Sequence, residues 1–247
     1  VISTCEELSY PNYAEPELAK ELDALAKKHD VTVLGTGINP GYLMDTLPIT
    51  LTGPCQNVKT IKVTRMMNSS KRRIPYQRKI GTGLLPEEFK KMIEEKKITG
   101  HVGLIESIAM IADALGWKLE EIRELRPEPV IAEGKIVTPY TTVKPGQVAG
   151  LKSVAYGVKE GRKVITLEFV SHAGVKEEYD AITIEGVPNI YQRIEGGVHG
   201  DIGTVATIIN SIPKVINANP GLVTMKDLPL PSAITEDIRI HIRGRET

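Results

Sequence analysis

The first fifty residues alternate between the spacing of an amphipathic helix and that of a buried strand. Apolar residues recur every three or four positions between residues 15 and 30, with charged residues between them, which predicts a helix. Residues 31–34 form a short apolar run typical of a buried strand, and a second short helix is expected at about 42–51. With residues 1–4 as another strand end, this pattern predicts a parallel sheet covered by helices.

The rest of the chain predicts a second kind of architecture. A strand is expected at residues 61–65, a helix beginning at Pro86, and another helix over residues 102–115. Four β-rich segments follow, at residues 136–143, 148–158, 163–170 and 178–184, and a last helix at 201–215. Strands that follow one another after helices indicate an α+β domain with a largely antiparallel sheet. The fold class expected is therefore α/β plus α+β.

Composition excludes several classes of protein. Lys and Arg number 31 in the 247 residues, as do Asp and Glu, so the formal charge is zero and neither a nucleic-acid nor a membrane partner is expected. No apolar run approaches the roughly 18 residues that a membrane span requires. The two cysteines, Cys5 and Cys55, make no disulfide framework and lack metal-ligand spacing. We expect a cytoplasmic protein without a metal site.

A glycine-rich segment follows the strand expected at residues 31–34. Gly35, Gly37 and Gly41 are similar to a dinucleotide fingerprint, in which glycines let a pyrophosphate approach a helix N-terminus. The third glycine comes one position late, Pro40 lies in the turn, and no carboxylate ends the next strand near Met67. The segment is therefore a phosphate loop, a plain turn, or a turn that faces another part of a ligand.

Two further segments could bind an anion. Gly81, Thr82 and Gly83 precede a helix, and their N–H groups, the hydroxyl and the nearby Lys79 could hold a carboxylate or phosphate. The alternative is a flexible surface loop. The basic residues Lys71, Arg72 and Arg73 could also bind a carboxylate, or could be simply solvated.

The candidate acid and base residues lie in loops. Glu6 and Glu7 follow a strand end, where ligands of open α/β sheets collect. His101 lies between two glycines and could exchange protons near neutral pH, with Glu106 reaching back toward it; a capping or core histidine is the alternative. The role of His199, which precedes the last expected helix, stays open.

Several blocks of sequence together resemble one family. The blocks are residues 4–8 (TCEEL), 35–41 (GTGINPG), 100–107 (GHVGLIES) and the tail from Gly200 to Pro229. They are similar to the 2,4-diaminopentanoate dehydrogenase family, which is related to dihydrodipicolinate reductase. The resemblance implies a Rossmann-type NAD(P)-binding domain, an α+β domain and a C-terminal helix that returns to the first domain.

The same resemblance implies domain boundaries. Residues 1–52 would be the remainder of the Rossmann-type domain, 53–198 the substrate and oligomerisation domain, and 199–247 the C-terminal helix and tail. The front of the Rossmann domain, including its pyrophosphate loop, would then precede Val1. A homodimer or homotetramer is expected.

Site residues are also implied. The segments that face the nicotinamide ring in the reductase relatives match Ser3, Thr4, Cys5, Gly37, Asn39 and Pro40. Gly81, Thr82 and Gly83 match a loop that holds a substrate carboxylate, and Lys71 lies near the position of the catalytic lysine. Met66 and Met67 stand where the reductases carry a histidine pair, which argues against lysine-pathway chemistry.

These implications give a working hypothesis for activity. The reaction would be NAD- or NADP-dependent oxidative deamination of 2,4-diaminopentanoate to 2-amino-4-oxopentanoate and ammonia. Glu6 would orient an ammonium, His101 and Glu106 would move protons, and Arg73 or Lys79 would complete the carboxylate clamp, with His199 in reserve. The alternatives are reduction of a related cyclic imine and a non-catalytic chain. The choice of dinucleotide and the substrate stereochemistry stay open.

Overall fold

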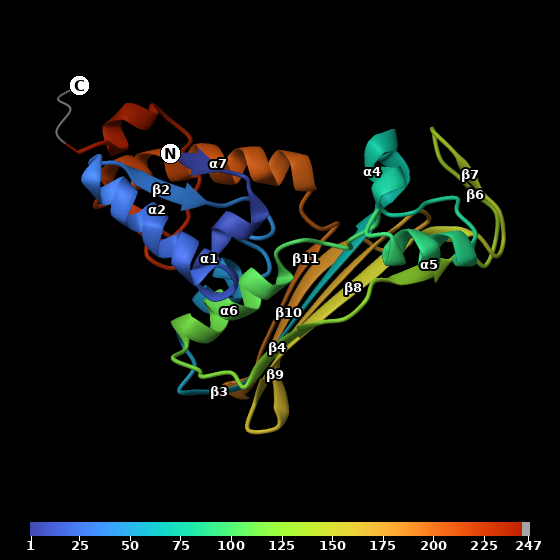
Figure 1. Ribbon diagram of the computed structural model, residues 1–247, viewed down its shortest axis with the longest axis horizontal. Coiled ribbons are helices and arrows are strands. Elements are labelled where there is room, and N and C mark those ends of the chain that lie inside the picture. The colour runs from blue at the N-terminus through green and yellow to red at the C-terminus, as the bar shows by residue number, and fades with distance from the viewer. Residues whose placement is uncertain (244–247) are drawn as a thin grey trace. The chain divides into compact units, whose positions relative to one another are not determined.

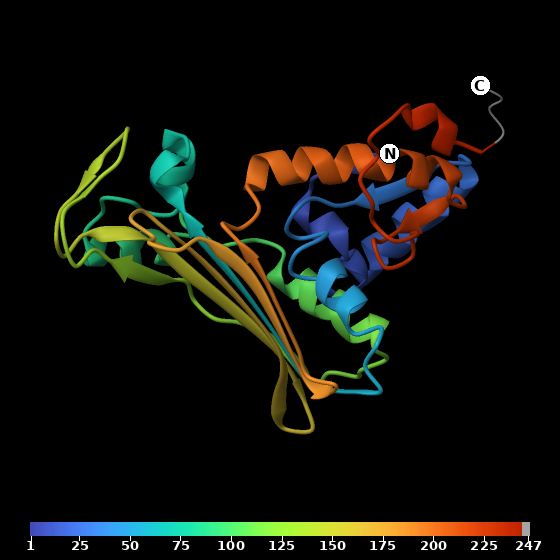
Figure 2. The ribbon, with the colours of Figure 1, turned by 180° about the vertical axis from the view of Figure 1, so that it is seen from behind.

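The computed structural model describes residues 1–243 and divides the chain into two compact units. Unit 1 comprises residues 1–54, 103–119 and the chain from His199 onward, and unit 2 comprises residues 55–102 and 120–198. Figures 1 and 2 show the ribbon from opposite sides. Residues 103–119, which the sequence expectation placed in the middle domain, thus belong to unit 1.

Unit 1 is built on a three-stranded parallel sheet. Its order is β1 (Ile2–Ser3), β2 (Thr32–Gly35) and β12 (Gly221–Val223), and both pairings are parallel. The parallel arrangement expected near the N-terminus is confirmed. The third strand was not expected, because three residues carry no recognisable period.

Helices accompany this sheet. The short elements are η1 (Glu6–Ser9), α1 (Pro11–Ala14), α3 (Thr46–Leu51) and η3 (Ile238–His241), and the longer ones are α2 (Pro16–Lys28), α6 (Leu104–Ala114) and α7 (Gly200–Asn217). Helix α2 begins with Pro16, whose fixed φ suits the first helical position. Its last turn contains Lys27 and Lys28, whose positive charges interact favourably with the negative C-terminal end of the helix dipole. None of the helices within residues 1–243 is long and apolar enough to cross a lipid bilayer.

Unit 2 is built on a seven-stranded sheet. The order is β11-β10-β3-β9-β8-β4, and β5 also pairs with β8. Every pairing is antiparallel except β3 with β9, so the expected largely antiparallel sheet is confirmed. The strands are β3 (Asn57–Asn68), β4 (Glu121–Glu124), β5 (Glu128–Ile131), β8 (Val148–Lys159), β9 (Arg162–His172), β10 (Tyr179–Val187) and β11 (Ile190–Glu195).

The segment expected as a strand at residues 136–143 is a small hairpin. It consists of β6 (Ile136–Val137) and β7 (Thr142–Val143), paired antiparallel. The hydroxyl of Thr138 accepts hydrogen bonds from the N–H groups of Tyr140 and Thr141, which closes the turn. The β-rich segment expected here is thus two short strands, with Pro139, which cannot donate to a ladder, in the turn between them.

One face of the unit 2 sheet is buried. Ile61, Val63 and Arg65 of β3 point to this face at a spacing of two residues, and all three are nearly inaccessible. Near one end of the sheet lie η2 (Ser69–Lys71), α4 (Ile74–Lys79) and α5 (Pro86–Glu94), which Figure 1 shows together. Their core cluster joins Ile80, Phe89, Ile98, Val148, Leu151 and Phe169.

Candidate active site

Two loops that were expected to face a nicotinamide ring are neighbours in unit 1. Strands β1 and β2 pair with Ser3 opposite Gly35, and the N–H of Thr36 donates to the Ser3 carbonyl at 2.9 Å. Both loops therefore leave the carboxyl ends of parallel strands, where open α/β sheets bind ligands. Thr4 and Cys5 are exposed there.

The glycines of residues 35–41 are explained by packing within the chain. A Cβ on Gly35 would lie 2.3 Å from the backbone of Leu8, and one on Gly41, where φ is +123°, would lie 2.5 Å from the Gly37 nitrogen. The carboxylate of Asp45 takes the N–H groups of Gly41 and Thr46. A negative side chain thus occupies the donors that a phosphate would need, so the phosphate-loop reading is wrong.

The turn itself is mostly buried. Gly37 lies near Thr204, whose hydroxyl accepts a hydrogen bond from the N–H of Ile38 at 3.3 Å. Pro40 packs against Gly103, where an added Cβ would lie 2.5 Å from the proline Cγ. Asn39 is half-buried and is therefore the more accessible of the residues expected to contact a cofactor in this turn.

Carboxylates gather in unit 1. Glu106 lies in the first turn of α6 and is buried. Burial raises the pKa of Glu106, and the negative charges of Glu7 and Glu6 raise it further, against a hydrogen bond to its own backbone N–H. The structure thus brings together Glu6 and Glu106, two of the predicted catalytic residues, and adds Glu7.

His101 lies in unit 2 and is packed as a neutral ring. Its imidazole stacks on Phe169 with centroids 4.3 Å apart, and its backbone N–H donates to the Ser153 hydroxyl at 3.1 Å. Burial lowers the pKa of His101 to about 3, assisted by the positive charges of Arg65 and Lys79. A pKa this low argues against proton exchange by His101 near neutral pH, and its catalytic role stays a prediction.

The expected support of His101 by Glu106 stays a prediction. His101 belongs to unit 2 and Glu106 to unit 1, although only four residues separate them in the chain. The charges that raise the pKa of Glu106 are those of Glu6 and Glu7, and the charges that lower the pKa of His101 are cationic. The pKa of Glu106 is thus raised and that of His101 lowered, in each case mainly by burial and then by the charges of different neighbours.

The Gly81–Thr82–Gly83 loop does not offer free N–H groups. The N–H of Gly81 donates to the Arg78 carbonyl, that of Thr82 to Gln77, and that of Gly83 to Val148 at 2.7 Å. The Thr82 hydroxyl donates to the Ala149 carbonyl at 3.3 Å. The prediction of a carboxylate held by these donors is wrong, because carbonyls of the same unit already occupy them.

Several cationic side chains lie in the same region. Lys79, in the last turn of α4, is exposed and close enough to His101 to affect its pKa. The guanidinium of Arg72 lies over the Tyr76 ring, 4.4 Å from its centroid, while the exposed Lys71 and Arg73 flank it in the chain. These groups could bind a carboxylate by charge and by the planar guanidinium fork.

His199 lies in unit 1. It is exposed and precedes α7 as the N-cap residue, without a hydrogen bond from its side chain to the helix. Its carbonyl accepts a hydrogen bond from the N–H of Gly203 at 2.8 Å. Among the described residues, no hydrogen bond or ion pair of this imidazole supports a catalytic role, which stays a prediction.

Sequence reasoning missed the ion pair of Arg65 and Asp180, which lies beside His101. Arg65 is 2% exposed, and its positive charge helps to lower the pKa of His101. A signal was present, because Arg65 follows Ile61 and Val63 at the two-residue spacing of an inward strand face. A charge at such a position needs a partner, and Asp180 of β10 is opposite Arg65 in the ladder.

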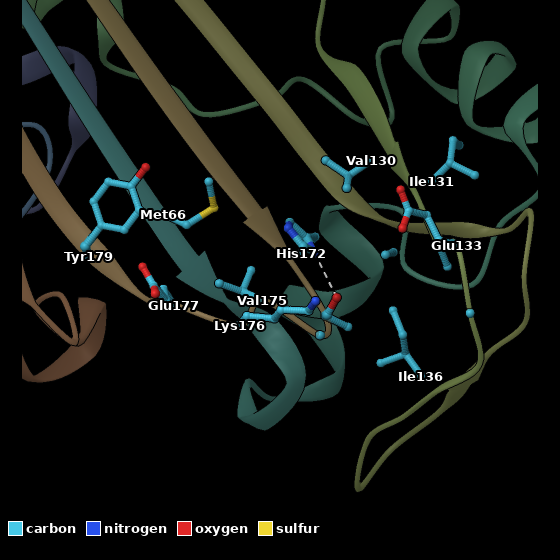
Figure 3. Close-up of a pocket in the computed structure, with 15 residues that line it drawn as sticks. Met66, Val130, Ile131, Glu133, Ile136, His172, Val175, Lys176, Glu177 and Tyr179 are labelled. Carbon is cyan, nitrogen blue, oxygen red and sulfur yellow. Dashed lines mark hydrogen bonds between the residues drawn. The ribbon is translucent and has the colours of Figure 1, made fainter.

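Unit 2 also contains a hollow of about 490 Å³ whose lining includes none of the predicted site residues. Figure 3 shows apolar side chains including Met66, Val130 and Ile136, with Glu133 and Lys176 among the polar ones. Nδ1 of His172 lies 2.8 Å from the Ala173 carbonyl, as the dashed line in Figure 3 marks. Within residues 1–243, no group of three or more His, Cys, Asp or Glu side chains could hold a metal ion.

Known proteins are similar to this chain in sequence and in fold. A sequence model of the 2,4-diaminopentanoate dehydrogenase C-terminal domain matches residues 42–244. The 2,4-diaminopentanoate dehydrogenase of Acetoanaerobium sticklandii is 44% identical over 244 residues, a match that covers 97% of this chain and 69% of the relative. An amine dehydrogenase of Streptomyces virginiae is 24% identical over 249 residues, covering 91% of this chain and 69% of the relative.

A solved structure extends the comparison to the fold. The amine dehydrogenase from Mycobacterium smegmatis superposes with a TM-score of 0.80 at 24% identity, covering 94% of this chain and 69% of that one. At that identity the likeness bears on the fold alone. The family model and the 44% identical relative bear on ancestry, and on their evidence the chain belongs to the 2,4-diaminopentanoate dehydrogenase family.

Proposed function

We propose that the protein is an NAD(P)-dependent dehydrogenase that deaminates 2,4-diaminopentanoate at C4, giving 2-amino-4-oxopentanoate and ammonia. The observation that carries this proposal is the buried Glu106 beside Glu6 and Glu7, in a chain 44% identical to a 2,4-diaminopentanoate dehydrogenase. The substrate carries a carboxylate at one end and an ammonium at C4. Carboxylate side chains suit the ammonium, and cationic side chains suit the carboxylate.

The first chemical requirement is a neutral amine. An ammonium has no lone pair to stabilise the carbon that loses a hydride, so its proton must leave first. Glu106 is the candidate base, because its raised pKa makes it a better proton acceptor than an ordinary carboxylate. Glu6 and Glu7 provide negative charge that attracts the ammonium to Glu106.

A bound nicotinamide dinucleotide supplies the hydride acceptor. The half-buried Ser3 and Asn39 and the exposed Thr4 and Cys5 fit the uncharged amide end of such a cofactor, because they are polar and lie at the carboxyl ends of parallel strands. Gly37 and Pro40 shape the turn beneath. Water then attacks the substrate imine, and loss of ammonia leaves the ketone.

Within unit 2 taken by itself, recognition of a carboxylate is assigned to the cationic side chains. Lys79 is the first candidate, because it is exposed and close to His101, and Arg72 is the second. Neutral His101 contributes a hydrogen bond rather than a proton. Lys71 and Arg73 add positive charge near them in the chain.

The test is a comparison of substrates and of matched variants. Formation of reduced nicotinamide is followed by absorbance with 2,4-diaminopentanoate, using NAD and NADP in separate assays, and dihydrodipicolinate reduction is measured in parallel. We expect amine-dependent turnover that Glu106→Gln lowers by about 10² to 10⁴, whereas the exposed Glu21→Gln leaves it unchanged. Reduction of dihydrodipicolinate without oxidation of the diamine would overturn the proposal.

A further inference from the structure

The buried carboxylate of Asp45 connects two segments that the proposed reaction uses. Asp45 is fully inaccessible to solvent. Its Oδ2 accepts hydrogen bonds from the N–H of Gly41 at 2.7 Å and from the hydroxyl of Ser107 at 2.8 Å. One oxygen atom therefore ties the turn that contains Asn39 to helix α6, on which Glu106 is the adjacent residue.

The other atoms around Asp45 fix its position. Its Oδ1 accepts from the N–H of Thr46 at 2.5 Å, and the Thr46 hydroxyl donates to the Gly41 carbonyl at 2.8 Å. The carboxylate is thus held by three donors, which offset the cost of burying its charge. Because each donor has a defined direction, the side chain cannot rotate without losing at least one bond.

A second contact joins the same two segments. Pro40 packs on Gly103, the N-cap residue of α6, so closely that an added Cβ would lie 2.5 Å from the proline ring. Gly103 has φ of +99°, which a side chain would also strain. The turn and the first helical turn of α6 therefore meet at two points, on either side of Glu106 in the sequence.

We propose that Asp45 is a positioning residue that holds the Glu106 carboxylate at a fixed place relative to the turn carrying Asn39, through its shared hydrogen bonds with Gly41 and Ser107. The inference rests on the proposed function, in which Glu106 accepts a proton and Asn39 contacts the cofactor. A proton acceptor is effective only within hydrogen-bond reach of the amine. A displacement of about 1 Å can lower a rate about 100-fold.

The chain offers a matched pair of serines for the test. Ser107→Ala removes one donor to Asp45, while Ser211→Ala removes a comparable buried hydroxyl that donates to the Thr207 carbonyl at 2.7 Å in α7. We expect Ser107→Ala to lower kcat for 2,4-diaminopentanoate about 10- to 100-fold with KM changed less than about twofold. The Ser211→Ala protein should keep both constants.

Amide hydrogen exchange gives a readout that is independent of turnover. The N–H groups of Gly41 and Thr46 should exchange about tenfold faster in Ser107→Ala, and faster still in Asp45→Asn, but not in Ser211→Ala. Unchanged exchange in Ser107→Ala, or unchanged kcat with faster exchange, would overturn the inference. If the unmodified protein oxidises no diamine, the proposed function fails, and exchange alone then decides whether Asp45 couples the two segments.

Discussion

Arg65 and Asp180 form an ion pair that is almost closed to solvent, with 3.4 Å between Nε and Oδ1. Both also bind the backbone of Val198, whose N–H donates to Oδ2 of Asp180 at 2.8 Å and whose carbonyl accepts from Nη2 of Arg65. Burial raises the pKa of Asp180 and the Arg65 charge lowers it. The pair thus holds the last residue of unit 2 by both of its backbone polar groups.

Loss of one partner should leave the other charge buried without compensation. We expect Asp180→Asn to lower the free energy of unfolding by about 3 to 5 kcal/mol, measured by urea denaturation. The control is Glu168→Gln, because Glu168 pairs with Lys152 and Lys62 on the more open sheet face, and about 1 kcal/mol is expected there. Equal losses in the two variants would show that burial of the Arg65 pair has no special cost.

His101 should remain uncharged across the neutral range. Its folded pKa of about 3 lies below the ordinary value of 6.5, so between these values the unfolded chain binds more protons than the folded one. Stability should therefore fall as pH drops from about 6.5 to 3, and His101→Asn should weaken that fall. An NMR titration of the imidazole between pH 5 and 8 checks the assignment, and a midpoint in that range would contradict it.

The carboxylates near Glu106 should determine the pH at which activity falls on the acid side of the pH profile. Glu106 must be ionised to accept a proton, so kcat/KM should fall as pH drops through its raised pKa. Because Glu7 raises that pKa by its negative charge, Glu7→Gln should move the limb to lower pH. The same limb in both proteins would mean that another group titrates.

Binding of the substrate carboxylate should depend on Lys79 rather than on Thr82. Lys79→Met is expected to raise KM by about 10- to 100-fold, the equivalent of a charge-assisted hydrogen bond of about 1.5 to 3 kcal/mol. Thr82→Val should leave KM unchanged and cost about 1 kcal/mol of stability, since its hydroxyl bonds to the Ala149 carbonyl. The opposite pattern would restore the loop as a carboxylate site.

Elements with a clear local period were predictable. The helix expected at residues 15–30 is α2 (Pro16–Lys28), and that expected at 201–215 is α7 (Gly200–Asn217). The short strand expected at residues 31–34 is β2 (Thr32–Gly35), but the similarly short β4, β5 and β12 were missed, because so short a run has no period of its own. β12 (Gly221–Val223) is one example, since it exists by pairing with β2 from far away in the sequence.

The chemistry of the site was less accessible from sequence, because it depends on neighbours that folding supplies. The imidazole of His101 is tuned by Arg65 and Lys79, and its ring stacks on Phe169, none of which is near it in the chain. The glycines around Thr82 suggested an anion site, but glycine content does not reveal which carbonyl takes each N–H. Glu6 and Glu106 were expected in one site, but the charge that Glu7 adds beside Glu106 was not, because it requires η1 and α6 to meet.

The chain passes from one unit to the other after Pro54, Val102, Leu119 and Val198. During synthesis, β3 must wait for β9 and β10, which follow it by about a hundred residues, before either of its edges is paired. Unpaired strand edges promote association with other chains. Production of this protein should therefore respond strongly to chaperones that shield nascent strands, and neither unit can be transplanted as one uninterrupted gene segment.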